Sequence, residues 1–278
     1  MEYGNNRIAV IGAGSMGGAI LSGLIAAGTA ADSITASTAT TASAKALTEK
    51  FSIKAFAIEA SDSANSDAAN NADILLIAVK PAKVLETLEQ IKDSVKDGAL
   101  VISVAAGVTT ESMEQAIGSK ASVIRAMPNT PSIVGHGVTG IAKGKSANDA
   151  QLELAKELFN TVGQVLVVEE DKINALSTIS GSGPAYVFYF AEKLIKAAKE
   201  LGFSQKEADQ MVRATFLGSA TLLAASSDSP ETLRAQVTSP NGTTMEATNT
   251  FDAYNLEGTI QMATRAALAR AIELGKIK

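Results

Sequence analysis

Residues Arg7–Gly18 read RIAVIGAGSMGG, and this stretch decides the fold. The apolar run Ile8–Ile11 is typical of a buried strand, and it leads into a G-x-G-x-x-G loop that opens a helix. In such a loop the first glycine permits a tight turn, the second lets the backbone approach a pyrophosphate, and the third allows helix and strand to pack closely. The phosphates then lie at the N–H groups of the helix N-terminus. The stretch therefore predicts a dinucleotide site at Gly12, Ala13, Gly14, Ser15, Met16 and Gly17; the alternative is a plain glycine-rich turn.

Outward from this loop, short apolar runs alternate with helical patterns. The further runs lie at 34–36, 53–56, 74–79, 100–104, 122–126, 137–142 and 165–168, and the helical patterns at 16–27, 42–50, 81–95 and 148–161. Alternation of this length predicts βαβ units and a mostly parallel sheet. Runs without polar alternation, such as ILLIAV, fit a sheet that is covered on both faces. We expect an α/β, Rossmann-like domain over residues 1–168.

The second part of the chain has a different character, since no convincing strand follows residue 171. Tyr186–Leu201 reads as a helix that closes at Gly202, the pair Ser204 and Glu207 forms a capping box that opens another helix, and Gly258–Leu274 is a third. The region is apolar and weakly charged, as in ALSTISGSGPAYVFYFAEKLI. We therefore expect an all-helical domain over residues 169–278 that also dimerises.

Composition excludes several classes of function. The chain has no Cys and a single His, His136, so disulfides, thiol nucleophiles and multi-His metal sites are excluded and no metal is expected. The net charge is −5 and no Lys/Arg cluster occurs, which argues against nucleic-acid binding. The longest apolar run, Ile74–Val79, is far short of a membrane span. A cytoplasmic protein without a nucleic-acid or membrane partner is the expectation.

The end of the second strand bears on the choice of dinucleotide. An Asp or Glu at this place binds the adenosine ribose 2′-hydroxyl in many dinucleotide sites, but the segment Ile34–Thr40 contains no acid. The hydroxyls of Ser37, Thr38 and Thr40 can instead donate to a 2′-phosphate. The segment favours NADP(H), with NAD(H) also usable, because it contains no Arg either; the alternative is a solvated loop.

Three further strand ends carry residues suited to a cofactor crevice. They are Ala78, Val79, Lys80 and Pro81; Ala105, Ala106 and Gly107; and Asn129 with Thr130. Small residues let a cofactor ring approach the backbone, and Asn129 and Thr130 could bond the nicotinamide or its ribose. A surface lysine and a rigid proline-rich connector are the alternatives.

The segment VTSPNGTT, residues 237–244, runs from a turn into a helix. The N–H groups and hydroxyls of Ser239, Gly242, Thr243 and Thr244 converge where a helix begins, which suits a small carboxylate. An elaborate helix cap explains the same residues equally well.

Together the segments IGAGSMG, AVKP, AAGV, RAMPNTP, GSGPAY and VTSPNGTT resemble those of the Δ1-pyrroline-5-carboxylate reductases, in the family's order. The resemblance implies a Rossmann domain followed by a helical domain that intertwines with a partner subunit, as a homodimer that can assemble further into a decamer. It implies the reduction of L-1-pyrroline-5-carboxylate to L-proline with NADPH or NADH.

By the same resemblance, Asn65 and the AVKP segment contact the cofactor. Ser239, Gly242, Thr243 and Thr244 bind the substrate, with Thr244 at the ring nitrogen as the candidate catalytic residue. Asn241 departs from the family, where Gly is common at this position, and the second strand end lacks the basic residue that many NADP-binding relatives carry.

A cyclic imine needs a hydride at carbon and a proton at nitrogen. The cofactor provides the hydride, and Thr244 is an orienting donor rather than a strong acid. Two alternatives remain: an NAD-dependent 3-hydroxyacid dehydrogenase-like enzyme and a non-catalytic NADP(H) redox sensor. Lys193 and Lys196 lack the Asn partner that the first alternative uses, and the second has no need of a carboxylate turn.

Overall fold

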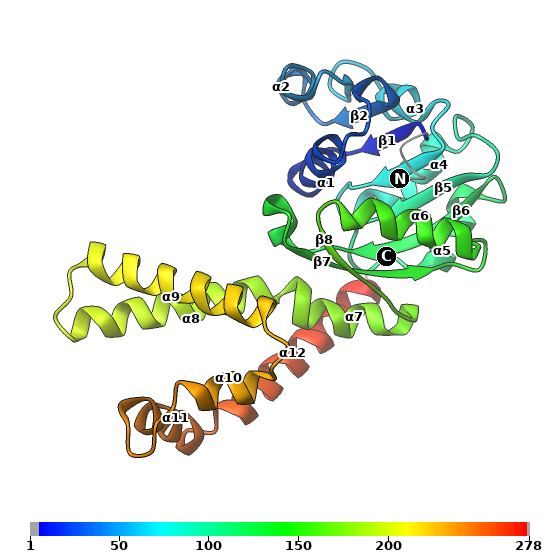
Figure 1. Cartoon of the computed structure of the whole chain (residues 1–278). Helices are drawn as coiled ribbons and strands as arrows, with labels where there is room; N and C mark the ends of the chain where they lie inside the picture. Colours follow the sequence, from blue (N-terminus) through cyan, green and yellow to red (C-terminus); the bar gives the residue numbers. More distant parts are fainter. Residues whose placement is uncertain (1–5, 277–278) are drawn as a thin grey trace. The chain divides into compact units, whose positions relative to one another are not determined.

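The computed structural model describes residues 6–276 and contains an eight-stranded sheet in the order β3-β2-β1-β4-β5-β6-β7-β8 (Figure 1). Strands β1 to β6 are parallel, β7 runs antiparallel to β6, and β8 runs parallel to β7. The strands are β1 Ile8–Ile11, β2 Ile34–Thr38, β3 Lys54–Ala57, β4 Ile74–Ile77, β5 Ala99–Ser103, β6 Ala121–Met127, β7 Gly137–Lys143 and β8 Gly163–Val167. The predicted mostly parallel sheet is confirmed.

The strand order reverses at β1. Ile8 of β1 is level with Ile34 of β2 on one side and with Ile74 of β4 on the other. The chain winds outward from β1 in one direction to β3 and then in the other through β4. Ligands of open α/β sheets bind at the carboxyl ends of the strands on either side of such a reversal.

The helices are α1 Ser15–Ala26, α2 Thr41–Phe51, α3 Ala64–Ala69, α4 Val84–Ile91, α5 Thr110–Ile117, α6 Asp149–Asn160, α7 Ile173–Leu176, α8 Gly183–Glu200, α9 Gln205–Ala225, α10 Pro230–Gln236, α11 Thr243–Ala253 and α12 Leu256–Lys276. The capping box at Ser204 and Glu207 is present, and Gly202 takes a φ of +97°. The prediction of one helix over 81–95 is wrong. Pro81–Lys83 forms a 3-10 turn, in which Lys83 N–H donates to Lys80 O, and α4 begins only after it.

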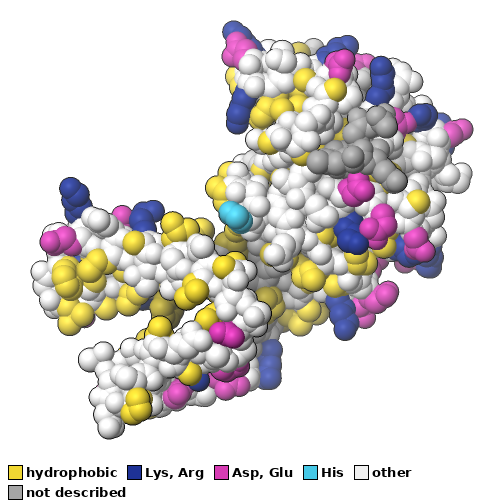
Figure 2. Space-filling model, in the orientation of Figure 1, with side chains coloured by type: hydrophobic (Ala, Val, Ile, Leu, Met, Phe, Trp, Pro, Cys, Tyr) yellow, Lys and Arg dark blue, Asp and Glu magenta, His cyan; other side chains and the backbone are white. Residues whose placement is uncertain are grey.

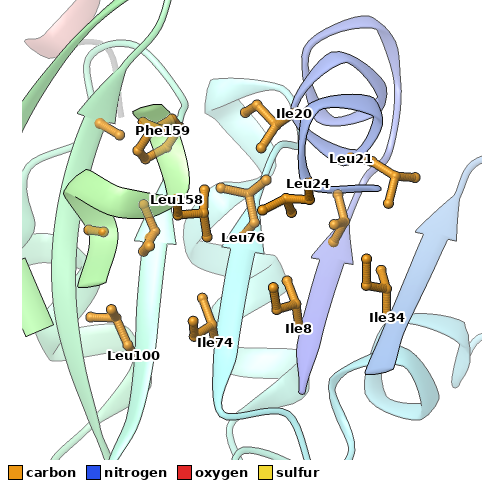
Figure 3. Packing of buried hydrophobic residues seen from close by; sticks show 14 of the residues in the cluster. Ile8, Ile20, Leu21, Leu24, Ile34, Ile74, Leu76, Leu100, Leu158 and Phe159 are labelled. Atoms are coloured by element: carbon orange, nitrogen blue, oxygen red, sulfur yellow. The ribbon is translucent and has the colours of Figure 1, made fainter. Parts of the chain in front are cut away.

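Strand residues alternate between two cores on the two faces of the sheet. On one face Ile8, Val10, Ile74 and Leu76 pack under α1 and α6, with Leu24 and Phe159 among the buried side chains (Figure 3). On the other face Ala9, Ile11, Leu75 and Ile77 pack under α3, α4 and α5. This double burial accounts for the uninterrupted apolar runs in the sequence.

The chain divides into two compact units, Met1–Ser182 with Ala267–Lys278, and Gly183–Ala266. They differ from the predicted domains 1–168 and 169–278 at residues 169–182 and 267–278, which are compact with the sheet. That division into domains stays a prediction.

The helical unit, Gly183–Ala266, has almost no core of its own. Its only buried hydrophobic residues are Ala208 and Val212. Large apolar side chains lie on its surface, among them Phe188 at 66% and Leu217 at 71% exposure, and Figure 2 shows apolar groups along its helices. A helical region of this kind needs an apolar partner surface to cover it.

The last turns of α12 return to the sheet unit. Gly107, in the loop after β5, has a φ of +77°, and a Cβ added to it would lie 3.2 Å from the Cα of Gly275. The loop and the helix therefore meet backbone to backbone, which only small residues allow.

Candidate active site

The three glycines of the loop after β1 meet three different constraints. Gly12 takes a φ of +81°, and a Cβ there would lie 2.6 Å from Cγ1 of Val79. At Gly17 a Cβ would lie 3.1 Å from the Cβ of Ala78 and 3.2 Å from Cγ1 of Val10, so α1 packs directly on the sheet. Both positions match the expected turn and helix packing.

Gly14 differs, because a Cβ there would meet nothing closer than 3.9 Å. This glycine is the N-cap of α1 and supplies no side-chain cap, so the first N–H groups of the helix stay available. The space in front of them is an anion cradle that a side chain would begin to fill. A dinucleotide pyrophosphate fits this donor set.

A cavity of about 780 Å³ extends from the glycine loop across the carboxyl ends of β2 and β4. Of the predicted cofactor residues, those that line it are Gly12, Ala13, Gly14, Thr38, Asn65, Ala78, Val79 and Lys80. Residues not expected from the sequence line it too: Ala39, Ser43, Ile58, Asp62, Lys83, Glu86, Thr87 and Gln90. Its volume and its place at the strand-order reversal suit a dinucleotide.

A series of side-chain hydrogen bonds fixes the glycine loop after β1. Ser37 is fully buried; its Oγ accepts from Gly12 N–H at 3.1 Å and donates to Asn65 Oδ1 at 2.7 Å. Asn65 Nδ2 donates to Gln90 Oε1 at 3.0 Å, and Gln90 Nε2 donates to the carbonyl of Asp62 at 2.8 Å. The glycine loop is thereby tied to α3 and α4.

The hydroxyls at the end of β2 are engaged within the chain. That of Ser37 is used as above, and that of Thr38, 3% exposed, donates to the carbonyl of Thr40 at 3.0 Å. Contrary to the expectation from the sequence, neither is free to donate to a 2′-phosphate. Their assignment as cofactor-binding residues stays a prediction.

The carboxylate of Glu59, which follows β3, lies beside the link from β2 to α2. Glu59 Oε1 accepts from Thr41 N–H at 2.6 Å, at the first residue of α2. Hydrogen bonds from the Thr41 side chain and backbone hold the pKa of the Glu59 carboxyl below its usual value. This group is therefore charged at neutral pH.

Other predicted residues surround a second cavity of about 520 Å³ in the sheet unit. Pro81, Ala106 and Gly107 line it together with Arg125. Arg125 is 4% exposed and donates to Asn174 Oδ1 at 3.0 Å and to Glu170 Oε1 at 3.5 Å. Burial lowers the pKa of its guanidinium, and Glu170 opposes that shift. These bonds fasten β6 to the segment that leads into the helical unit.

The side chain of Asn129 forms hydrogen bonds within the chain. Its Nδ2 donates to Ser180 O at 2.8 Å, and its Oδ1 accepts from Val138 N–H at 2.8 Å. One Nδ2 hydrogen is left for a ligand. Thr130 is exposed at the start of a 3-10 turn, and Ala105 N–H bonds Ser103 Oγ at 3.3 Å.

In the helical unit, the turn Ser239–Gly242 leads into α11. Gly242 N–H donates to Ser239 O at 3.0 Å, and Asn241 takes a φ of +59°, which explains how Asn stands where Gly is common. Helix α11 begins at Thr243 with Gly242 as an N-cap that offers no side-chain bond. Among the described residues, no hydrogen bond engages the hydroxyls of Ser239, Thr243 or Thr244, so all three can bind a carboxylate or a ring nitrogen.

Residues 6–276 contain no group of three or more His, Cys, Asp or Glu side chains that could hold a metal ion. None of their helices is long and apolar enough to cross a membrane.

A glycine loop that opens a helix, a cavity at the strand-order reversal and a free anion-binding helix start in a second unit define a dinucleotide-dependent oxidoreductase. Residues 170–274 match the model of pyrroline-5-carboxylate reductase dimerisation, and residues 7–107 match that of NADP oxidoreductase, coenzyme F420-dependent. The chain belongs to the pyrroline-5-carboxylate reductase family.

Individual relatives agree with this assignment. A pyrroline-5-carboxylate reductase of Corynebacterium melassecola is 38% identical over 74% of this chain and 77% of its own. The structure of a pyrroline-5-carboxylate reductase from Coxiella burnetii superposes with a TM-score of 0.91 at 36% identity, over 98% of this chain and 99% of that one. The Plasmodium falciparum enzyme, whose structure has NADP bound, gives a TM-score of 0.82 at 26% identity over 98% and 99%.

Sequence reasoning missed Glu59 and Gln90. Gln90 lies on the exposed side of an amphipathic helix, with no signal of its own. Glu59 has no local signal either, because its position depends on β3 pairing with β2.

Proposed function

We propose that this chain reduces 1-pyrroline-5-carboxylate to proline with NADPH, and with NADH as a usable second cofactor. The observation that carries the proposal is the pair of anion-binding helix starts: α1 behind an open glycine loop, and α11 behind a turn with three unengaged hydroxyls. The first suits a dinucleotide pyrophosphate and the second suits a small carboxylate. Membership of the family supports the same two roles, a dinucleotide site and a carboxylate site.

The dinucleotide would be held by the glycine loop and by the cavity residues of β2 and β4. Gly12, Ala13, Gly14, Ser15, Met16 and Gly17 would receive the pyrophosphate, while Asn65, Ala78, Val79, Lys80 and Pro81 would flank the ribose and phosphates. Ser37 and Thr38 would shape the adenosine end. Ala105, Ala106, Gly107, Asn129 and Thr130 would lie toward the nicotinamide, which supplies the hydride when bound.

The substrate carboxylate would be held by Ser239, by the Gly242 turn and by the first N–H groups of α11. Thr244 would place its hydroxyl at the ring nitrogen. With no Cys and only His136 in the sequence, the chain offers few strong general acids. The residues therefore act mainly by holding the imine carbon in a reactive orientation, with the nitrogen entering as an iminium or bonded to Thr244.

The test is a steady-state assay of NADPH oxidation with pyrroline-5-carboxylate. Thr244→Ala should lower kcat about tenfold or more if it bonds a charged iminium, since such a bond is worth about 1.5–3 kcal/mol. Thr244→Ser, which keeps the hydroxyl, is the matched control and should retain most activity. Ser239→Ala should instead raise KM for the imine, because a carboxylate anchor binds ground and transition states alike.

Two outcomes would contradict this assignment. Turnover of a 3-hydroxy acid with NAD and none of the imine would move the chain to the hydroxyacid dehydrogenase class. Tight NADPH binding without turnover of either substrate would indicate a redox sensor.

The proposal includes a homodimer that covers the apolar surface of residues 183–266, assembly of dimers up to a decamer, and a cytoplasmic location. Sedimentation velocity measures the first two directly. A stable, active monomer at micromolar concentration would contradict the dimer.

A further inference from the structure

Glu59 directly follows Ile58, which lines the dinucleotide cavity, and its backbone N–H bonds Ala39 O, another lining residue. We propose that Glu59 sets the preference between NADPH and NADH, by placing a negative charge beside the adenosine 2′ position. The inference rests on the proposed function, since it concerns the cofactor of that reaction. It makes Glu59 a specificity-determining residue.

The adenosine 2′ position can be located from the fold. In sheets of this kind the ribose lies at the carboxyl end of the second strand, where an acid commonly binds the 2′-hydroxyl. Here β2 ends at Thr38, and the cavity continues along Ala39, Ser43 and Ile58. A 2′ substituent would therefore face the link from β2 into α2.

Glu59 is fastened to that link by two bonds. Its backbone N–H donates to Ala39 O at 3.1 Å, and its Oε1 accepts from Thr41 N–H at 2.6 Å. The second bond engages the first N–H of α2, which would otherwise favour a phosphate. The chain thus supplies from β3 the acid that β2 lacks.

Among the described residues, no Lys or Arg forms an ion pair with Glu59, whose side-chain partner is Thr41. The sequence has no Lys or Arg between Arg7 and Lys45. Lys45 is exposed and pairs with Glu49 at 3.7 Å. Two cations line the cavity: Lys83 bonds Glu86 at 2.8 Å, and Lys80 follows β4, which is three strands away from β3 in the sheet. Asp62 adds a further negative charge to the lining.

NADPH and NADH differ only in the 2′-phosphate, so only NADPH experiences this repulsion. A single charge about 6 Å from a phosphate dianion changes binding about tenfold even at the dielectric constant of water. We expect the wild-type protein to prefer NADPH only modestly, because the charge of Glu59 weakens NADPH binding and leaves NADH binding unchanged.

The experiment compares full-length wild type with Glu59→Gln, which keeps an acceptor for Thr41 N–H and removes the charge. Kd values for NADPH and NADH are measured by fluorescence titration without substrate, at 0.05 and 0.5 M NaCl. Glu111→Gln is the control: it removes the same charge from an exposed site on α5, which follows β5, about 14 Å from β2 across the sheet.

The Kd ratio of NADH to NADPH should rise about tenfold in Glu59→Gln at low salt and stay within twofold of wild type in Glu111→Gln. Salt should raise the ratio less in Glu59→Gln than in wild type, because the screened charge is gone. If wild type binds both cofactors and Glu59→Gln leaves the ratio within twofold, the inference is overturned while the proposed function stands. If wild type binds neither cofactor, the proposed function fails, and this inference fails with it.

Discussion

A comparison of the single variants Gly12→Ala and Gly14→Ala separates effects on folding from effects on cofactor binding. The two positions lie only two residues apart but face different surroundings. An alanine at Gly12 would hold a φ of +81°, which costs about 1–2 kcal/mol for a residue with a Cβ. Its Cβ would also lie 2.6 Å from Cγ1 of Val79 and 3.0 Å from that residue's backbone nitrogen, and overpacking of this kind costs about 1–3 kcal/mol.

The two contributions sum to about 2–5 kcal/mol for Gly12→Ala, or a fall in Tm of about 4–20 °C for a unit of this size. For Gly14→Ala the nearest heavy atom is 3.9 Å away, and the exchange at an N-cap should cost less than about 1 kcal/mol. Its methyl group, however, adds bulk at the N-cap of α1, where the backbone must approach the phosphates closely. We expect a near-native Tm with NADPH affinity lowered about tenfold or more, since the backbone no longer reaches the phosphates.

Thermal melts by circular dichroism and NADPH titrations of both variants provide the assay. The double variant Gly12→Ala with Val79→Ala removes the overlap with Cγ1 but keeps the backbone strain, so it should recover only part of the lost Tm. If Gly12→Ala melts at the wild-type temperature, or if Gly14→Ala melts as low as Gly12→Ala, the reading of these two contacts is refuted.

Three other expectations follow from described contacts. Ser37→Ala leaves Asn65 Oδ1 without its donor, while Gly12 N–H loses Ser37 Oγ and keeps Ser37 O as an acceptor. The variant should raise KM for NADPH, with a stability loss of about 1–3 kcal/mol in urea titrations; a change in kcat alone would contradict this role. The pKa of Asp73 is pushed up by burial, but the bonds from Lys96 and from Arg7 N–H outweigh that effect and hold it below its usual value. A lowered carboxyl pKa contributes stability above the unfolded pKa that is lost as pH falls through the folded one, so wild type should lose stability more steeply than Asp73→Asn below about pH 4, and parallel profiles would contradict it. Phe188→Asp places a charge on the exposed apolar surface of α8 and should shift the protein towards monomers in light scattering, whereas an unchanged mass would exclude this part of α8 from the interface.

The sheet could be predicted from the sequence because burial on both faces leaves a local signature. Ile8–Ile11 is a strand at the bounds expected, and ILLI at Ile74–Ile77 lies in both cores as its composition indicated. Helix α3 was not predicted, since its six residues ANSDAA show no apolar periodicity, and α5 and α10 are similarly short. Local signals weaken when a helix makes fewer than three turns.

The site was predictable where a motif fixes geometry and not where pairing of distant strands does. The turn of Gly12 and the start of α11 at Thr243 follow from residue type alone. The direction of the Ser37 hydroxyl depends on its register beside Ile11, and the position of Glu59 depends on β3 lying beside β2. Both are tertiary facts without a trace in the neighbouring sequence.

The contact between Gly107 and Gly275 has a consequence for the order of synthesis. The loop after β5 is made early, whereas the helix turn that packs on it emerges only after the whole of Gly183–Ala266 has been translated. At about 5–20 residues per second, the synthesis of the chain from Gly107 to Gly275 takes on the order of 8–34 s. During it, the nascent sheet would have to persist with this loop uncovered, and ribosome-bound chains halted before Ala267 should be cut by a protease near Gly107 more readily than released ones.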